Sequence, residues 1–244
     1  MLPPDLLLYF MLLALLAEVV GTVGGFGSSL LFVPLAGYFL DYHSVLGVAA
    51  LYHLSSNAAK IYFFRAGFDR RLILQMGLPS VLAAITGALM SGLLPSALLT
   101  LLLAGFLIGL GGLLLLFRQF RLRPVAANAV LGGLASGFLS GLLGTGGAVR
   151  GVVLAAYGLP AQVFIATSAI IDFGIDASRS VVYAASGFVH HDDLYLIPLL
   201  LGVSVVGTWL GKKIVGILTE QQFQSIVLLL VIAAGGLTLW RAWG

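Results

Sequence analysis

Cysteine is absent from the 244 residues, and charged side chains make up only 9% of them. Without cysteine there is no disulfide framework, no thiolate metal site and no thiol nucleophile. Sparse charge together with 60% apolar residues is typical of a chain with several membrane spans rather than of a soluble domain. The net charge of +3 comes from short clusters between apolar runs, so we expect no nucleic-acid partner.

The start of the chain also lacks the features of a removable signal peptide. Its first 20 residues have no basic region and no cleavage site of small residues, and they contain Asp5 and Glu18. We therefore expect membrane structure from the beginning of the sequence.

Long apolar runs fill most of the sequence. About 20 residues cross the hydrocarbon core once, and six runs fit this length: 44–64, 71–91, 97–117, 162–186, 193–212 and 222–240. The runs 6–40 and 125–158 are too long for one crossing, and each has a glycine-rich loop near its middle. Irregular backbone survives at membrane depth only where protein covers it or it lines a hydrated cavity. We predict that each long run forms a hairpin of two short helical arms that enters and returns on one side.

The two glycine loops are related by a shift of 120 residues. Gly21, Gly24 and Gly27 match Gly141, Gly144 and Gly147, and Gly87 with Gly207 extends the match. The alternative is that these glycines let helices pack closely. Each half then has a hairpin and three spans, an odd number of crossings, so the second half is inserted in the opposite orientation.

The predicted fold class is therefore an all-α polytopic membrane protein of two inverted repeats. Each repeat is a glycine-broken helical hairpin plus three transmembrane helices. The first repeat takes residues 1–117, a cytoplasmic linker takes 118–124, and the second repeat takes 125–244.

Charge placement agrees with returning hairpins. One side of the membrane then receives Arg65, Arg70, Arg71, Arg118, Arg121, Arg123, Lys212 and Lys213. The other side receives Arg241 and the acidic turn 190–193. Because cytoplasmic loops carry the excess of Lys and Arg, both termini are expected to be external. If each long run crossed the membrane once, one side would receive seven cations and the other two. This differs little from the eight to one that returning hairpins give, so the lengths of the runs favour hairpins more strongly than the charges do.

Two spans carry polar side chains on one helical face. His53, Asn57 and Lys60 are spaced i, i+4 and i+7. The second half repeats this spacing 119 residues later, with Asp172, Asp176 and Arg179. Ionisable groups inside a membrane usually face a bundle interior, a partner or a cavity. For Lys60 the alternative is that its long side chain extends to the cytoplasmic interface.

The carboxylates have two interpretations, and the sequence leaves both open. Glu18 precedes the first loop and is either a coupling carboxylate or the partner of a buried cation. Asp172 and Asp176 are either proton carriers or simple counter-ions of Arg179 and Arg150.

The motifs Gly24-Gly25-Phe26-Gly27, running into Val33-Pro34, and Gly144-Thr145-Gly146-Gly147, running into Tyr157-Gly158-Leu159-Pro160 and Ala166-Thr167-Ser168, carry a resemblance. They resemble the TauE/SafE sulfite exporter family, also called the toluene sulfonate uptake permease family, from about Glu18 to Trp240. The resemblance implies a bacterial or archaeal cytoplasmic-membrane transporter of small anions, commonly sulfite, sulfonates or organosulfur acids. The second motif departs from the family by continuing into Ala148-Val149-Arg150-Gly151, so the substrate of the family is not transferred directly.

We expect a transporter of a small oxyanion that works by alternating access, with the two hairpin loops meeting near the bilayer midplane. Helix N-termini offer unpaired amides and positive potential, and buried cations would add net positive charge. The predicted substrate-binding residues are Gly25, Gly27, Ser28, Ser29, Asn57, Lys60, Gly144, Thr145, Gly146, Gly147, Arg150 and Arg179. The candidates for proton coupling are Glu18, Asp172 and Asp176.

Neither a metal nor a cofactor is expected, and no set of residues indicates an enzyme. The alternatives are a channel-like anion conduit and a carrier of carboxylates rather than sulfur oxyanions. An inside-negative potential favours export of an uncoupled anion by roughly 2.3 kcal/mol per charge per 100 mV, so import would need coupling. The expected partners are a small anion and the lipid bilayer, and the many small residues suit a homodimer.

Overall fold

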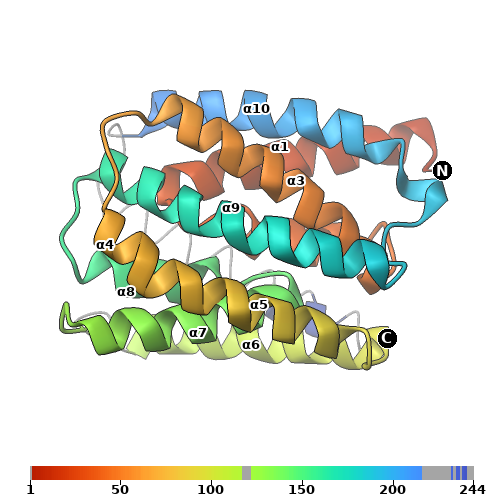
Figure 1. The fold of residues 1–244 in the computed structure, drawn as a ribbon. Helices are drawn as coiled ribbons and strands as arrows, with labels where there is room; N and C mark the ends of the chain where they lie inside the picture. The colour runs from red at the N-terminus through yellow and green to blue at the C-terminus, as the bar shows by residue number, and fades with distance from the viewer. Residues whose placement is uncertain (1, 117–121, 216–231, 233–234, 237, 241–244) are drawn as a thin grey trace.

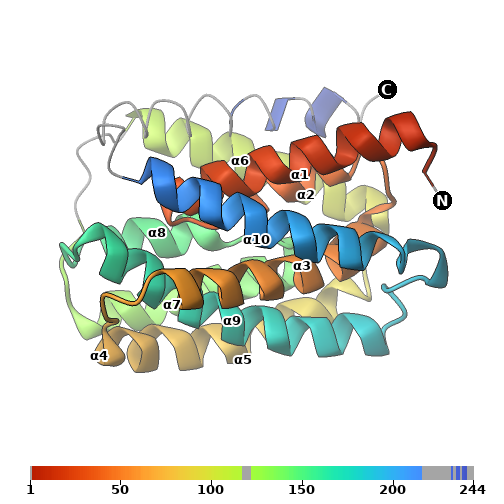
Figure 2. The same ribbon diagram turned by 90° about the horizontal axis from the view of Figure 1, so that it is seen from above.

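The structure is a computed structural model that describes residues 2–116, 122–215, 232, 235–236 and 238–240. Every regular element in these residues is helical, as predicted. The elements are α1 (Pro4–Gly24), α2 (Ser29–Ala36), α3 (Tyr42–Phe63), α4 (Arg70–Leu72), the π-helical turn η1 (Ile73–Gly77), α5 (Leu78–Ser91), α6 (Ser96–Leu116), α7 (Ala126–Leu143), α8 (Gly147–Ala155), α9 (Ala161–Ala185), the 3₁₀ turn η2 (His191–Asp193) and α10 (Leu196–Ile214). Figure 1 shows the long helices lying side by side, and Figure 2 places α5 and α6 on opposite edges of the bundle.

Six helical stretches in the described residues are long and apolar enough to cross a membrane: α1, the continuous unit α4–α5, α6, α7, α9 and α10. Four of them coincide with predicted single spans. The predicted span 44–64 is present as α3, which has 22 residues but is not among these six stretches. One face of α3 carries the polar residues His53, Asn57 and Lys60. The predicted span 222–240 lies almost wholly outside the described residues. The chain is a multi-pass membrane protein.

The hairpin arms differ from the prediction in length. Two short arms were expected, but α1 and α7 have 21 and 18 residues, whereas α2 and α8 have 8 and 9. The reason is where the helices end. Gly25 and Gly144 follow α1 and α7 in the left-handed region, with φ of 65° and 77°, and this conformation ends each long arm near the middle of its apolar run. The second arms then end early, at Ala36 and Ala155.

Each hairpin nevertheless returns to the end of the bundle from which it started, as predicted. After α2, the Phe39 ring packs against Phe10 near the start of α1, with ring centroids 5.2 Å apart. After α8, the Tyr157 hydroxyl donates a hydrogen bond to the Val125 carbonyl, just before α7, over 2.8 Å. Most residues of α2 and α8 are buried, which explains why these arms are apolar on nearly every side.

The two hairpins start from opposite ends of the bundle. The N-terminus lies beside the turn before α10, where Leu2 N–H donates to Tyr195 Oη over 2.7 Å, and both are at the right in Figure 1. The start of α7 lies at the opposite end, with the loop between α3 and α4.

The halves also exchange packing partners. Gly87 of α5 lies against the Phe138 carbonyl of α7, and its counterpart Gly207 of α10 lies against Glu18 of α1. A two-fold relation between halves produces such an exchange. The inverted repeat itself stays a prediction, because the counterpart of α6 falls outside the described residues.

The two ends of the bundle differ in charge. Every described Lys and Arg outside the interior lies at the end that holds the α3–α4 loop: Arg65, Arg70, Arg71, Arg123, Lys212 and Lys213. The opposite end carries Asp41, Asp192 and Asp193. Arg118, Arg121 and Arg241 lie outside the described residues. The charge separation that the sequence predicts is therefore present in these parts of the fold.

Glycine also brings α5 and α7 into close contact. A Cβ atom at Gly137 would lie 2.0 Å from the Ser80 carbonyl oxygen, and one at Gly141 would lie 2.0 Å from that of Ala84. Gly141 was predicted to belong to the second loop, and this is wrong. It lies in α7, where the alternative interpretation as a close-packing residue applies.

Candidate functional site

The two glycine loops, residues 25–28 and 144–146, meet in the interior of the bundle, as predicted. Ser29 Oγ donates a hydrogen bond to Thr145 Oγ1 over 3.4 Å. A side chain at position 147 would collide with the first loop, because a Cβ atom there would lie 1.7 Å from the Phe26 carbonyl oxygen. Glycine at this position is therefore what allows the loops to touch.

Glu18, in α1, belongs to the first of three buried ion pairs. Its carboxylate lies 2.8 Å from Lys60 Nζ, and no part of it is exposed. Hydroxyl groups donate hydrogen bonds to the same carboxylate over 2.6 to 3.0 Å, from Thr22, Ser28, Ser56 and Thr208. Lys60 is 4% exposed, so the interpretation in which it extends to the interface is wrong. Glu18 is the partner of a buried cation.

Arg150 and Asp172 form the second pair. The two terminal nitrogens of the fully buried guanidinium each donate to one oxygen of Asp172, in a bidentate arrangement. Arg150 Nε donates to Ser168 Oγ over 3.0 Å, and that hydroxyl in turn donates to the Gly25 carbonyl over 3.0 Å. Arg150 thus links α8 to α9 and, through Ser168, to the first hairpin loop.

Arg179 and Asp176, one turn apart in α9, form the third pair at 2.8 Å. Arg179 also donates to the Ser140 carbonyl at the end of α7 over 2.8 Å. The second oxygen of Asp176 accepts a hydrogen bond from Asn57 Nδ2 over 2.7 Å. The polar stripes of α3 and α9, which the sequence predicted separately, therefore face each other.

The three pairs correct one expectation about the site. Lys60, Arg150 and Arg179 were expected to give it net positive charge, but each of these cations has a carboxylate within hydrogen-bonding distance. The formal charges of these six side chains sum to zero. Spacing along a helix predicts which face a charge occupies, but it does not predict which charge of another helix lies opposite.

A small cavity lies between the stripes and the loop ends. Nine of the predicted site residues line it: Gly27, Ser28, Ser29, Asn57, Lys60, Gly144, Asp172, Asp176 and Arg179. Six predicted site residues lie outside the lining: Glu18, Gly25, Thr145, Gly146, Gly147 and Arg150. The cavity leaves about 10 Å³ for the centre of a water-sized sphere, which is room for about one water molecule.

Three lining residues were not among the predicted binding residues: His53, Ser56 and Ser140. His53 was placed on the polar stripe, but no chemistry was assigned to it. Ser56 precedes Asn57 on that stripe, and Ser140 lies one turn before the second loop. Small hydroxyl residues within one helical turn of a polar stripe or a glycine loop are the sequence signal that could have found the two serines.

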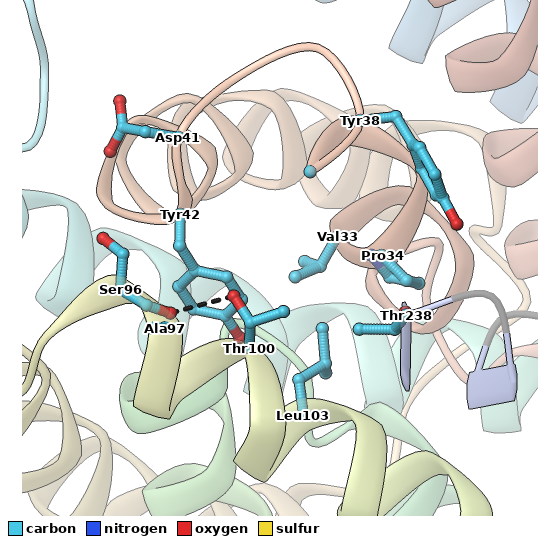
Figure 3. Close-up of a pocket in the computed structure, with 11 residues that line it drawn as sticks. Val33, Pro34, Tyr38, Asp41, Tyr42, Ser96, Ala97, Thr100, Leu103 and Thr238 are labelled. Atoms are coloured by element: carbon cyan, nitrogen blue, oxygen red, sulfur yellow. Dashed lines mark hydrogen bonds between the residues drawn. The ribbon is translucent and has the colours of Figure 1, made fainter. Parts of the chain in front are cut away.

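A second, larger cavity of about 210 Å³ lies between the end of α2, the start of α3 and the start of α6 (Figure 3). In Figure 3, Tyr42, Thr100 and Leu103 face Val33 and Pro34 across it. Its one charged lining residue among the described residues is Asp41, which suits an anion poorly. We therefore place the candidate anion site at the central cavity.

The two cavities are close neighbours. Val33 lines the larger one and also lies against Gly144, which lines the central one. Packed side chains, including that of Val33, therefore separate the two cavities.

Comparison with known proteins gives the family of the chain. The chain matches the family described as Sulfite exporter TauE/SafE over residues 10–238. It is 25% identical over 249 aligned positions to the "Probable membrane transporter protein YdhB" of Bacillus subtilis (strain 168), an alignment that covers 96% of this chain and 100% of that protein. No solved structure matches the chain. Because the family match extends over nearly all of the sequence, the chain belongs to the sulfite exporter TauE/SafE family.

Proposed function

We propose that the protein is a secondary transporter of a small oxyanion, with sulfite, an organosulfonate or another organosulfur acid as its substrate class. We place it in a bacterial or archaeal cytoplasmic membrane with its acidic end external. Family membership and the name of the relative support membrane transport. The observation that carries the choice of an anion is that the N-terminal end of α2 and two buried cations, Lys60 and Arg179, line one cavity.

An oxyanion can bind there even though the fixed charges cancel, because donors are left over. Lys60 has three N–H donors, and Ser56 and Glu18 accept from two of them. Arg179 contacts Asp176 and the Ser140 carbonyl through its three nitrogens and also interacts with the Tyr183 hydroxyl, which leaves one of its five N–H groups. The N-terminal end of α2, at Ser28 and Ser29, adds a positive helix dipole.

Binding requires the site to open, because a sulfur oxyanion is larger than the single water molecule that the cavity admits. The short arms α2 and α8 are the elements that we propose to move, since each is attached to its long arm through a glycine loop. Movement of the two arms in turn would give alternating access. The same narrowness counts against a continuously open conduit.

The test is uptake of sulfite into proteoliposomes under an imposed membrane potential, with sulfate, methanesulfonate and acetate as competitors. We expect saturable flux that methanesulfonate inhibits, driven by the potential if the anion moves alone and by a pH gradient if it moves with a proton. Flux that never saturates would support a conduit, and inhibition by acetate alone would support a carboxylate carrier. Absence of flux under either a potential or a pH gradient would contradict the proposal.

A charge-balanced variant tests the location of the site. Lys60→Met combined with Glu18→Gln removes a cation together with its counter-ion, so no unpaired buried charge remains. Loss of a hydrogen bond from a charged donor should weaken oxyanion binding by about tenfold or more. Lys212→Met, at the exposed cationic end, is the matched control and should leave affinity unchanged. Equal affinities in the two variants would remove Lys60 from the site.

A further inference from the structure

His53 is a buried ionisable group at the central cavity, and it belongs to none of the three ion pairs described above. It lies on α3, is 4% exposed and lines the cavity beside Lys60 and Arg179. The rings of Tyr52 and Phe32 pack on it, with centroids 4.9 and 5.6 Å away. Its Nδ1 lies 3.0 Å from Ser28 Oγ, whereas Nε2 is buried and has no hydrogen-bond partner among the described residues.

The hydrogen bonds around Ser28 determine which ring nitrogen can change its protonation. Ser28 has a single hydroxyl hydrogen, and it donates this hydrogen to Glu18 Oε2 over 2.7 Å. The Glu18 carboxylate is paired with Lys60 and can only accept. His53 Nδ1 must therefore donate to the Ser28 oxygen, so Nδ1 carries a proton in the neutral ring as well as in the charged ring. The atom that gains or loses a proton is Nε2.

The charged groups that line the central cavity, or that pair with its lining residues, come from four elements. They are Glu18 on α1, Lys60 on α3 itself, Arg150 on α8, and Asp172, Asp176 and Arg179 on α9. These six pair with one another, and α2 contributes no ionised side chain to this group. A proton on Nε2 would thus be an uncompensated positive charge in a buried site, and a lone bound oxyanion would be an uncompensated negative one. Each is unfavourable alone, and together they neutralise each other.

We infer that His53 is the proton-coupling residue of the transporter, and that its Nε2 takes up a proton when an oxyanion enters the central cavity. The inference rests on the proposed function. The proton comes from the water on the side where the anion binds, and Nε2–H then donates a hydrogen bond to an anion oxygen. When the site opens to the other side, anion and proton leave together. One monoanion therefore moves with one proton, and the carboxylates Glu18, Asp172 and Asp176 keep their role as counter-ions.

The experiment compares the wild-type protein with His53→Gln in proteoliposomes. Glutamine keeps a polar side chain but does not titrate, so counterflow of labelled anion should persist without coupling. The probes are methanesulfonate and sulfite between about pH 5 and about pH 8, the range in which an unperturbed histidine titrates. The titration of the anion itself is the same for both proteins, so the ratio of their affinities reports His53. We expect this ratio to change about tenfold per pH unit where the free imidazole is neutral.

Two further readouts complete the test. A pH gradient should drive accumulation of the anion by the wild type but not by His53→Gln, and addition of methanesulfonate to weakly buffered wild-type protein should remove about one proton from solution per anion bound. The control variant His43→Gln alters a histidine that packs on Phe188 away from the cavity, and it should behave as the wild type.

The outcomes separate the two proposals. Accumulation driven by a pH gradient in His53→Gln, or wild-type binding without proton uptake, would overturn the inference while leaving the transporter intact. Absence of saturable flux of both probes in the wild type would overturn the proposed function itself. If His53→Gln fails to fold, binding by the wild type without proton uptake still overturns the inference, and His53→Asn, which is also polar and does not titrate, takes its place in the comparison.

Discussion

Arg150 is held inside the protein by three hydrogen bonds to two residues of α9. Its guanidinium grips both oxygens of Asp172 and donates to Ser168, and none of it is exposed. Sequence reasoning selected Arg150 for direct contact with substrate, because it follows a glycine loop at the start of a helix. The structure gives it a second use as the link between the two hairpins, and it lies outside the lining of the central cavity.

At the residue scale we predict that removing one charge of this pair is worse than removing both. Arg150→Met should lower the free energy of unfolding by about 3 to 5 kcal/mol, because it leaves the Asp172 carboxylate buried without its cation. The double variant Arg150→Met with Asp172→Leu leaves no unpaired charge and should regain much of this loss. Thermal unfolding of the purified single and double variants in detergent measures the difference.

The comparison of the single and double variants is a double-mutant cycle, and one outcome would contradict the prediction. If the two single effects simply add in the double variant, the ion pair does not couple the two side chains.

At the scale of the element, the fold depends on the positions where glycine lets two helices pack closely. The π-helical turn η1 and α5 pack against α7 at Gly133, Gly137 and Gly141, and at each of these glycines a Cβ atom would lie within 2.4 Å of a backbone oxygen. The spacing of four residues places all three on one face of α7. Their positions are readable from the sequence, but their function as a packing surface rather than as a loop required the partner helix.

We predict that Gly137→Ala destabilises the protein although alanine favours helices. The new methyl group would meet the Ser80 carbonyl oxygen at 2.0 Å, so α5 and α7 must separate, and overpacking of this kind typically costs about 1 to 3 kcal/mol. The matched control is Gly105→Ala on α6, where no described atom lies within 4 Å. That variant should be neutral or slightly stabilising, because alanine lowers the entropy of the unfolded chain.

Unfolding temperatures of the two variants decide this prediction. Equal temperatures would show that α5 and α7 are not in the close contact described. A fall in the control as large as in Gly137→Ala would show that the effect belongs to glycine replacement in general.

At the scale of the whole molecule, the hairpins and the charge separation predict how the bundle is oriented in a membrane. The cationic end, which contains Arg65 and Lys212, should face the cytoplasm, and the acidic end, which contains Asp192, should face outward. Because the chain has no cysteine of its own, labelling of a single engineered cysteine reports the side of the membrane on which that position lies.

We predict that a membrane-impermeant maleimide labels Asp192→Cys in intact cells and labels Arg65→Cys only after the membrane is opened. The reason is that the two positions lie at opposite ends of the bundle. Labelling of both positions from one side would contradict the arrangement of spans, and the reverse pattern would keep the fold but invert its orientation.

The sequence by itself determined the class of protein and the outline of its elements. Low charge and long apolar runs indicate a membrane protein. Helices suit such a protein because they satisfy their own backbone hydrogen-bonding groups in lipid. Glycine at 25 and 144 ends two helices, since a left-handed residue cannot continue them. The i, i+4, i+7 spacing places six polar groups on two helical faces. These are local properties, and local sequence is sufficient to predict them.

The tertiary structure alone decided which charges meet, which residues line the cavity and how long each hairpin arm is. Glu18 and Lys60 are 42 positions apart, and Arg150 and Asp172 are 22 apart, so no helical period relates them. Their pairing follows from the way α1, α3, α8 and α9 pack. The same packing leaves His53 Nε2 buried with no hydrogen-bond partner in the described part of the chain, and this property depends on several helices at once.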